Sequence, residues 1–218
     1  MTNEFAPFTI SKPEKVLYNK ICKLVRTQFN KKVENIETIC DDQHGKPKAY
    51  KLTIRKSTPI RLDIKHDAYL TDLQIILNKF DIEIPKVLGV FGKYKFSEWI
   101  DGLMLSHVAD NPEVFIASGE MMARLNLIKI KDKFVTNSEF SLSNAVWTKD
   151  KEIYIIDHGK MKLVKKTDST IARVLMKRIK NKKNIELFLK GYSKYKDITK
   201  IKAMITKYNY KWKNYVAR

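Results

Sequence analysis

The sequence predicts an α+β fold of two lobes, a small β-rich N-terminal lobe and a minimal helical C-terminal lobe. Between about 33 and 65, short β-like runs are separated by turn residues. Between about 169 and 218, apolar residues recur at spacings of three and four, which is the period of a helix. With a connector near 97–103, these patterns predict an N-terminal lobe over 1–98 and a C-terminal lobe over 99–218.

The expected N-terminal lobe combines a leading helix with an antiparallel sheet. Residues 13–29 place their apolar side chains on one helical face, with Pro13 near the start. The runs VENIETI, AYKLTIR and PIRLDIK follow as strands. The separator DDQHGKPK contains Gly45 and Pro47 and predicts a hairpin loop. Residues 67–80 return to a helical pattern, and two or more strands are expected after them.

The expected C-terminal lobe begins with a helix over 111–130, because Asn111 is a good N-cap and Pro112 suits a first turn. A polar loop, NSEFSLSN, follows at 137–144. The runs NAVW and EIYIID then predict a pair of strands that turns at TKDK. From about 169 to 218 the chain is expected to be helical, with lysines on the faces that the apolar stripe leaves free.

The charge of the chain is concentrated near its C-terminus. The formal net charge is +19, and residues 159–218 hold 19 Lys or Arg against three acidic residues, whereas residues 1–158 hold 24 against 21. This uneven distribution favours polyanionic partners: nucleic acid, phosphorylated glycolipid, an anionic membrane surface or an acidic protein. A lysine-rich tail that only keeps the protein in solution remains an open alternative.

The composition indicates a globular protein of the cytoplasm. Hydrophobic residues make up 44% of the chain, enough for a core. No run of eighteen apolar residues occurs, and the N-terminal sequence lacks the basic-then-apolar order of a signal peptide. Peripheral attachment to an anionic membrane surface is compatible with the basic segment.

Two side chains flank the expected strand pair near 145–156. Asn144 precedes it and Asp157 follows it, so a short hairpin would bring their oxygen atoms together. Carboxylate and amide oxygens are the ligands that Mg²⁺ takes from proteins, usually one or two of them beside phosphate oxygens. The spacing therefore predicts a Mg²⁺ site at the open end of this hairpin.

Six stretches, in this order, resemble motifs of one superfamily: LDIK, YLTDLQIILNKF with IPKVLG, FSEWIDG, GEMMARLN, NSEFSLSN and IIDHG. Over residues 33–165 the chain resembles the protein-kinase-like superfamily. The similarity is greatest to its small divergent branch of aminoglycoside phosphotransferases, lipopolysaccharide-core and Kdo kinases and RIO-type kinases. The resemblance implies a two-lobed protein-kinase-like fold that uses ATP and Mg²⁺.

The resemblance also assigns a role to individual residues. Lys65 would hold the phosphates, Asp72 would orient Lys65, and Glu139 would act as the base toward the acceptor hydroxyl. Asn144 and Asp157 would hold the metal. The adenine would meet the backbone of the hinge, at Glu98, Trp99 and Ile100. Only about sixty residues follow Asp157, so the acceptor is expected to be a hydroxyl of an anionic glycolipid, a small molecule or a protein bound in an unusual way.

The chain departs from the superfamily at four positions. Glu139 replaces the usual Asp of the loop, Asp72 stands in the place of the usual Glu, and Asn137 and Asn126 stand where His is usual. The extra methylene of Glu139 matters, because a misplacement of about 1 Å can cost on the order of 100-fold in rate. Two alternatives therefore stay open beside an active kinase: a pseudokinase-type nucleotide-binding or regulatory module, and a nucleic-acid-associated basic protein on a kinase-like scaffold.

Overall fold

The computed structural model describes residues 15–41, 47–64, 67–156 and 161–216, and gives no side-chain surroundings for 40–48 and 209–216. The chain divides into two compact units. The first unit comprises Met1–Ile75 and Pro85–Trp99, and the second comprises Ile76–Ile84 and Ile100–Arg218. Residues 76–84, which lie inside the segment expected for the N-terminal lobe, thus belong to the second unit.

The first unit is built on a five-stranded antiparallel sheet with the order β1-β2-β3-β5-β4. Its strands are β1 (Val33–Asp41), β2 (Pro47–Ile54), β3 (Ile60–Ile64), β4 (Val87–Phe91) and β5 (Tyr94–Glu98). Gly92 turns β4 into β5 at a φ of 60°, a backbone conformation that glycine adopts without strain. The expected antiparallel sheet is confirmed.

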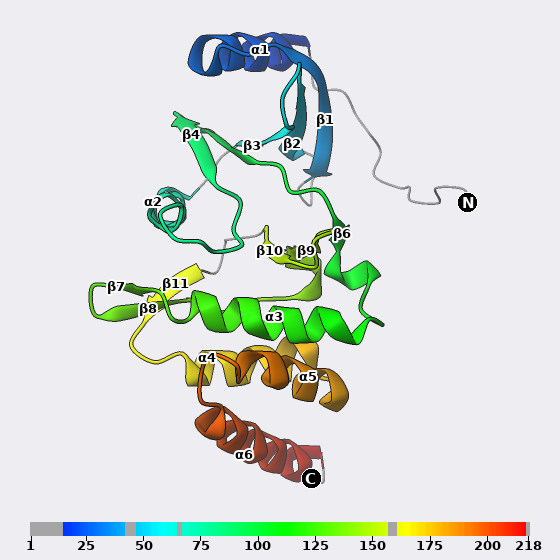
Figure 1. The fold of residues 1–218 in the computed structure, drawn as a ribbon, viewed down its shortest axis with the longest axis vertical. Helices are drawn as coiled ribbons and strands as arrows, with labels where there is room; N and C mark the ends of the chain where they lie inside the picture. Colours follow the sequence, from blue (N-terminus) through cyan, green and yellow to red (C-terminus); the bar gives the residue numbers. More distant parts are fainter. Residues whose placement is uncertain (1–14, 42–46, 65–66, 157–160, 217–218) are drawn as a thin grey trace. The chain divides into compact units, whose positions relative to one another are not determined.

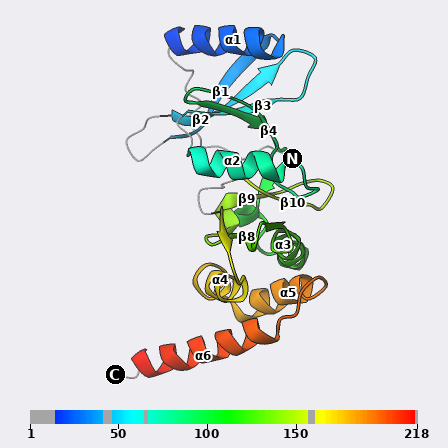
Figure 2. The same ribbon diagram turned by 90° about the vertical axis from the view of Figure 1, so that its left-hand side faces the viewer.

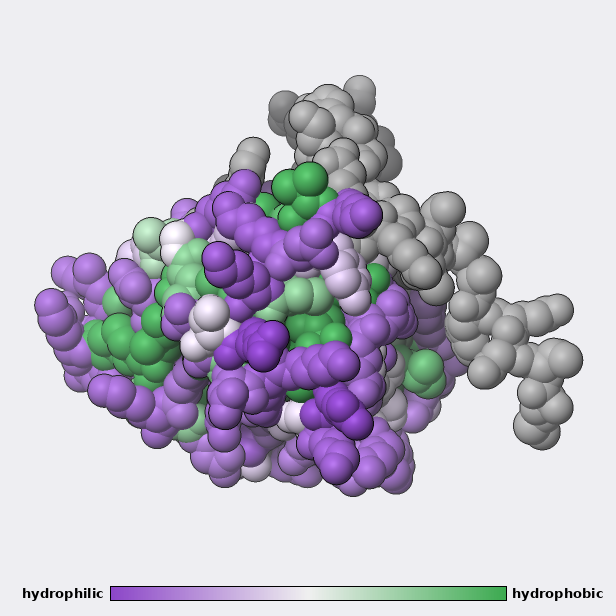
Figure 3. All heavy atoms as spheres, turned by 90° about the horizontal axis from the view of Figure 1, so that it is seen from above, coloured by the Kyte–Doolittle hydropathy of each residue, from purple (hydrophilic) through white to green (hydrophobic). Residues whose placement is uncertain are grey.

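Helix α1 (Lys15–Phe29) covers one face of this sheet, as Figure 1 shows. Ile21 and Val25 of α1 are buried in one hydrophobic cluster with residues of every strand except β4, among them Leu62 and Phe96. Most of the surface seen from the α1 side is hydrophilic (Figure 3). The expected amphipathic helix therefore supplies the core of the first unit with its apolar stripe.

Helix α2 (Ala68–Leu77) starts directly behind a side-chain cap. The Asp67 carboxylate accepts a hydrogen bond from the Leu70 backbone N–H at 2.9 Å, and the Thr71 hydroxyl donates to the Asp67 carbonyl at 2.8 Å. Leu73 and Leu77 are buried. The helix expected over 67–80 is thus present, with its first turn fixed by Asp67.

The second unit contains two small sheets and several helices. The first sheet has the order β10-β9-β6 and the second the order β11-β8-β7, all antiparallel. The strands are β6 (Leu103–Met104), β7 (Lys129–Ile130), β8 (Lys133–Asn137), β9 (Ala145–Trp147), β10 (Ile153–Ile155) and β11 (Met161–Val164). The helices are η1 (Leu105–His107), α3 (Pro112–Leu125), η2 (Leu142–Asn144), α4 (Asp168–Val174), the π-helix η3 (Leu175–Ile179), α5 (Lys182–Tyr192) and α6 (Thr199–Val216).

The helix expected over 111–130 is five residues too long at its end. Helix α3 begins as predicted, with the Asn111 side chain accepting from the Glu113 N–H at 3.0 Å, but it ends at Leu125. The chain then enters β7, and Lys131 turns it into β8 at a φ of 56°. The apolar pattern LNLIKI suits a strand as well as a helix, and pairing with β8 decides between them.

The helices of the second unit pack in layers that Figures 1 and 2 show from two sides. Helices α3 and α5 cross closely, because Gly119 of α3 faces the backbone of Phe188 and Gly191 of α5 faces the backbone of Ile116. Helix α6 packs against α4 and buries Ile201 there. In the described part of the chain, no helix is long and apolar enough to cross a membrane.

Candidate functional site

The loop after β8 holds the candidate base. Asn137 ends the strand and is 2% exposed, and its side-chain oxygen accepts a hydrogen bond from the Glu139 backbone N–H at 2.9 Å. Phe140 is fully buried beside Phe188 of α5, with ring centroids 6.3 Å apart. The loop is therefore held on both sides of Glu139, by the Asn137 side chain and by a buried ring.

The Glu139 side chain reaches the surface next to the π-helix η3. Its carboxylate lies 3.5 Å from the Arg178 guanidinium, and the two side chains are 42% and 46% exposed. An ion pair that is this exposed contributes little to stability. Its consequence is positional, since a partner on η3 faces the carboxylate and limits the directions in which it can point.

Asn144 lies at the end of the short helix η2 and at the start of β9. Its backbone carbonyl accepts a hydrogen bond from the Ile156 N–H at 3.0 Å, and the register of the hairpin pairs Ala145 with Ile155. The predicted strand pair is therefore present, and it brings Asn144 next to the residue that precedes Asp157. Asp157 itself lies outside the described residues.

The surroundings of Asn144 fit an oxygen-ligated metal. Its amide oxygen has a weak contact at 3.5 Å, from the Ser143 hydroxyl, so it remains able to accept a stronger partner. In the described part of the chain no three His, Cys, Asp or Glu side chains form a cluster that could hold an ion. A site built from one amide and one carboxylate matches Mg²⁺, which fills its remaining positions with phosphates and water, better than it matches zinc.

The expected hinge lies at the end of β5 in the first unit. Glu98 is held against β4, because its N–H donates to the Lys86 carbonyl at 2.9 Å and its carboxylate accepts from the Lys86 N–H at 3.0 Å. The Lys51 ammonium lies over the Trp99 ring, 4.7 Å from the centroid. Glu98 therefore fixes the strand end with both its backbone and its side chain.

Beyond Trp99, the second unit takes up the chain with Ile100. Two residues later a side chain at Gly102 would collide with the β9 backbone at Trp147. The glycine of FSEWIDG thus has a packing reason in this structure, because only a residue without a Cβ lets the chain pass β9 so closely.

One face of the sheet in the first unit carries a partly buried charge cluster that no sequence motif indicated. Asp63 on β3 pairs with Arg61 at 2.9 Å and with Lys95 of β5 at 3.2 Å. The Asp63 side chain is 15% exposed and that of Lys95 is 12% exposed. Burial acts to raise the pKa of Asp63, but the charges of Arg61 and Lys95 and their hydrogen bonds outweigh it and hold the pKa below its usual range.

Helix α2 meets this cluster through Gln74, not through Asp72. Gln74 is 1% exposed; its amide N–H donates to the Pro85 carbonyl at 2.8 Å, and its carbonyl accepts from the Lys95 ammonium at 3.3 Å. Asp72 is exposed on the same helix. Lys65 lies outside the described residues, so the expected pairing of Lys65 with Asp72 stays a prediction. No sequence pattern predicted a role for Gln74; a signal that could have indicated it is its place inside the largely apolar run LQIIL of α2.

The motif GEMMARLN has structural roles in the second unit. Arg124 forms an ion pair with Glu83, a residue of the segment Ile76–Ile84, and the Glu83 carbonyl accepts from the Ile155 N–H at 3.1 Å. Asn126 caps α3 and donates to the Tyr192 hydroxyl at 3.0 Å. Burial raises the pKa of Tyr192. Asn126 therefore joins two helices of the core.

Comparison with solved structures identifies the fold. The AMP-bound complex of spectinomycin phosphotransferase matches with a TM-score of 0.64 at 11% identity, over 86% of this chain and 84% of that chain. An ADP-bound aminoglycoside phosphotransferase matches with 0.62 at 11% identity, over 89% and 86%. Ethanolamine kinase of Plasmodium vivax matches with 0.64 at 13% identity, over 88% and 79%.

These likenesses confirm the expected two-lobed protein-kinase-like fold, as found in phosphotransferases of small molecules. No protein-family profile matches the chain, and no curated protein sequence matches it. At such low identities the likeness concerns the fold, and the chemistry of this chain rests on its own residues.

Proposed function

We propose that this protein is an ATP- and Mg²⁺-dependent phosphotransferase that acts on a hydroxyl group. The fold supports this proposal, because structures of the same fold that were solved with AMP or ADP are phosphotransferases. The observation that carries it is the hydrogen bond from the Ile156 N–H to the Asn144 carbonyl at 3.0 Å. Ile156, the donor of this hydrogen bond, is followed directly by Asp157, and consecutive Cα atoms lie about 3.8 Å apart.

Asn144 and Asp157 are the residues that would hold Mg²⁺ in this proposal. The ion would supply positive charge against the phosphate oxygens of ATP. The chain contributes the geometry: η2 fixes Asn144 on one side and β10 leads to Asp157 on the other. A backbone hydrogen bond joins Asn144 to Ile156, the residue that precedes Asp157, so the proposal depends on local pairing and not on distant packing.

Glu139 is the proposed base. Its backbone is anchored by Asn137 and its neighbour Phe140 is buried, so the carboxylate projects from a fixed loop. It would accept the proton of the acceptor hydroxyl as that oxygen attacks the terminal phosphorus and ADP leaves. Arg178 would keep the carboxylate oriented in the absence of acceptor.

The nucleotide would meet Lys65 and the backbone that follows the end of β5. Lys65 is proposed to bind the phosphates, and the backbone at Glu98 to Ile100 is proposed to meet the adenine. Glu98 supports this role indirectly, since its two bonds to Lys86 hold the strand end in place. Asp72 is retained as a partner of Lys65 only as a prediction.

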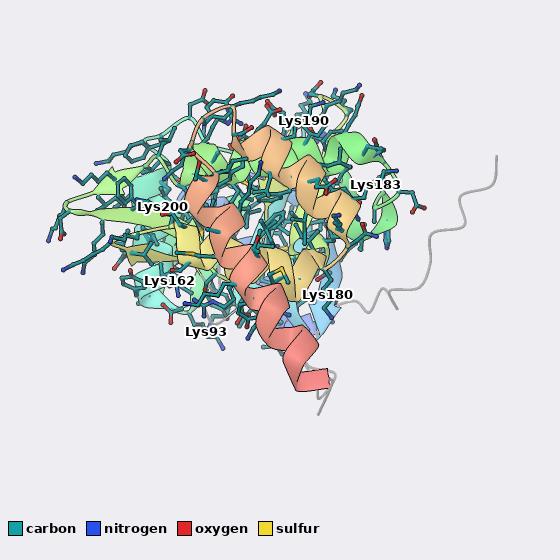
Figure 4. All side chains as sticks on the ribbon, turned by 90° about the horizontal axis from the view of Figure 1, so that it is seen from below. Lys93, Lys162, Lys180, Lys183, Lys190 and Lys200 are labelled. Atoms are coloured by element: carbon teal, nitrogen blue, oxygen red, sulfur yellow. The ribbon has the colours of Figure 1, made fainter. Side chains whose placement is uncertain are left out.

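The acceptor is proposed to be anionic: a glycolipid headgroup, a small phosphorylated molecule or an acidic protein. Described side chains at 161–208 include exposed cations such as Lys177, Lys183, Lys190 and Lys202, while the exposed acids there are Glu186 and Asp197. Figure 4 shows that Lys180, Lys183, Lys190 and Lys200 lie on different sides of α5 and α6. Such a broad positive field attracts polyanions from many directions. A glycolipid acceptor would bring the protein from the cytoplasm to an anionic membrane surface.

Transfer from labelled ATP tests the proposal. The purified protein should hydrolyse ATP or transfer its terminal phosphate in the presence of Mg²⁺, and Asp157→Asn should abolish this turnover. Asp150→Asn is the matched control, because Asp150 is an exposed acid in the turn of the same hairpin. Equal rates for wild type and Asp157→Asn would overturn the assignment of the metal site.

The pseudokinase alternative is favoured by one observation, the engagement of Glu139 by Arg178. A protein of this kind would bind ATP, and its melting temperature would rise with nucleotide while wild type and Asp157→Asn were equally inactive.

The nucleic-acid alternative rests on the exposed lysines. It requires RNA binding that falls steeply with salt, is lost on Lys-to-Glu changes in 177–183 and is unaffected by Asp157→Asn.

A further inference from the structure

In the first unit, a side chain of α2 helps to position Lys95, a lysine of strand β5. The ammonium of Lys95 on β5 lies 3.2 Å from an Asp63 carboxylate oxygen and 3.3 Å from the Gln74 side-chain oxygen. Gln74 is itself held, because its amide donates to the Pro85 carbonyl at 2.8 Å. Lys95 is thus positioned by one neighbouring strand and one helix, the arrangement that the sequence analysis expected for Lys65 with Asp72.

Lys95 faces the side of the sheet that α1 does not cover. Tyr94 and Phe96, its neighbours on β5, are buried in the core with α1. Side chains alternate along a strand, so Lys95 points the opposite way, as does Asp63 beside Leu62. In sequence, Lys65 stands two residues after Asp63, the spacing that places two side chains on one face of a strand. Lys95 and the proposed phosphate-binding lysine are therefore expected to share a face.

The Lys95 ammonium keeps capacity for a further partner. An ammonium has three N–H donors, and two of them are accounted for by Asp63 and Gln74. Within the described residues no third acceptor is recorded for it. Asp63 is shared with Arg61 at 2.9 Å, so one carboxylate faces two cations and the cluster keeps a net positive charge.

We propose that Lys95 contacts the polyphosphate of the nucleotide and that Gln74 and Asp63 position it for this contact. The inference rests on the proposed function, because it assumes a nucleotide on this face of the first unit. Gln74 of α2 would then position Lys95 of β5, in the way that Asp72 was expected to position Lys65. A neutral Gln orients the ammonium without cancelling its charge, which leaves that charge for phosphate oxygens.

Nucleotide binding by the full chain separates a phosphate contact from a structural role. Calorimetry with Mg-ADP and with adenosine is done on wild type, Lys95→Met and Lys93→Met. Lys93 is an exposed lysine at the turn between β4 and β5, so its variant removes the same charge from the same hairpin. Lys95→Met should weaken ADP about 10- to 100-fold, the range of a charge-assisted hydrogen bond, and leave adenosine unchanged. Lys93→Met should bind both ligands as wild type does.

Three results would contradict the inference. Equal loss of ADP and adenosine would assign Lys95 to structure, and wild-type ADP affinity in Lys95→Met would exclude the contact. If Lys93→Met weakens ADP binding as much as Lys95→Met does, the effect is one of overall charge and not of a direct contact. If the wild-type protein does not bind ADP, the proposed function is itself contradicted. If Lys95→Met does not fold by circular dichroism, the double variant Asp63→Asn/Lys95→Met removes both opposite charges and takes its place, with Asp63→Asn as reference.

Discussion

The two units organise their candidate functional residues by different means. In the second unit, Asn137 and Asn144 are fixed by hydrogen bonds from the local backbone: the Asn137 side chain accepts from the Glu139 N–H, and the Asn144 carbonyl accepts from the Ile156 N–H. In the first unit, Asp63, Gln74 and Lys95 are fixed by side chains from separate elements, β3, α2 and β5. The first arrangement depends on sequence neighbours within one loop and hairpin, while the second depends on how a helix packs on a sheet.

This difference explains why the sequence predicted the hairpin at Asn144 but not the residue of α2 that meets Lys95. A hairpin register follows from strand alternation and turn length, so the neighbourhood of Asn144 could be read from the sequence. Which side chain of α2 meets the sheet depends on how the helix lies against it: Gln74 is buried and reaches Lys95, whereas Asp72 is exposed. An acidic residue at about the right position in the sequence is therefore weaker information than a strand pair with the right ends.

The largest expected effect concerns the chemistry of the second unit. Glu139→Gln keeps the size of the side chain and its loop but removes the charge that accepts a proton, so kcat should fall about 10²- to 10⁴-fold. Affinity for Mg-ADP should stay as in wild type. Steady-state kinetics with labelled ATP and calorimetry measure the two quantities. An unchanged kcat would show that Glu139 is not the base.

Removal of the buried ring beside Glu139 tests how the loop is anchored. Phe140→Ala empties a fully buried site next to Phe188 and should lower the free energy of unfolding by about 3–5 kcal/mol. Urea denaturation followed by circular dichroism measures the change. Leu127→Ala is the control, since Leu127 is 49% exposed in the same unit and should change the stability little. Similar midpoints for both variants would contradict the burial of Phe140.

The charge cluster of the first unit should make stability depend on pH. The pKa of Asp63 is lowered in the folded protein, so its contribution is present above the unfolded-state value near pH 4 and is lost as the pH falls through the folded value. Asp63→Asn should cost about 2 kcal/mol at pH 7 and less at pH 3. Urea midpoints at both values check this. Asp72→Asn changes an exposed acid of the same unit and should cost less than Asp63→Asn at pH 7.

The smallest expected effect compares Asp72 and Gln74, two polar residues of α2. Gln74→Leu removes bonds to Lys95 and to the Pro85 carbonyl and should cost about 1–3 kcal/mol in unfolding free energy. Asp72→Ala lies on the exposed face, so its change should stay within about 0.5 kcal/mol. Thermal melts of the two variants measure the difference. If Asp72→Ala is the more damaging variant, Asp72 has a partner that the described residues do not include.

Much of the candidate site in the second unit could be predicted because its geometry is local. Asn137, Glu139 and Asn144 lie within eight positions of one another, and the hairpin that follows has strands of three residues each. The sequence did not predict that Arg178 faces Glu139, because 39 positions separate the two residues. In addition, η3 is a π-helix, and the spacing of apolar residues does not predict a π-helix. The roles of Lys65 and Asp157 remain predictions, because both lie outside the described residues.

The sequence by itself determined the leading helix, the antiparallel strands of the first unit and the hairpin that starts at Asn144. Alternation, turn residues and helical period act over a few positions, and that range suffices for these features. Only the tertiary structure decided that α3 gives way to β7 after Leu125, that Gln74 and not Asp72 meets Lys95, and that Arg178 reaches Glu139. Those outcomes depend on contacts between elements far apart in the chain, where packing selects among faces that local patterns leave equivalent.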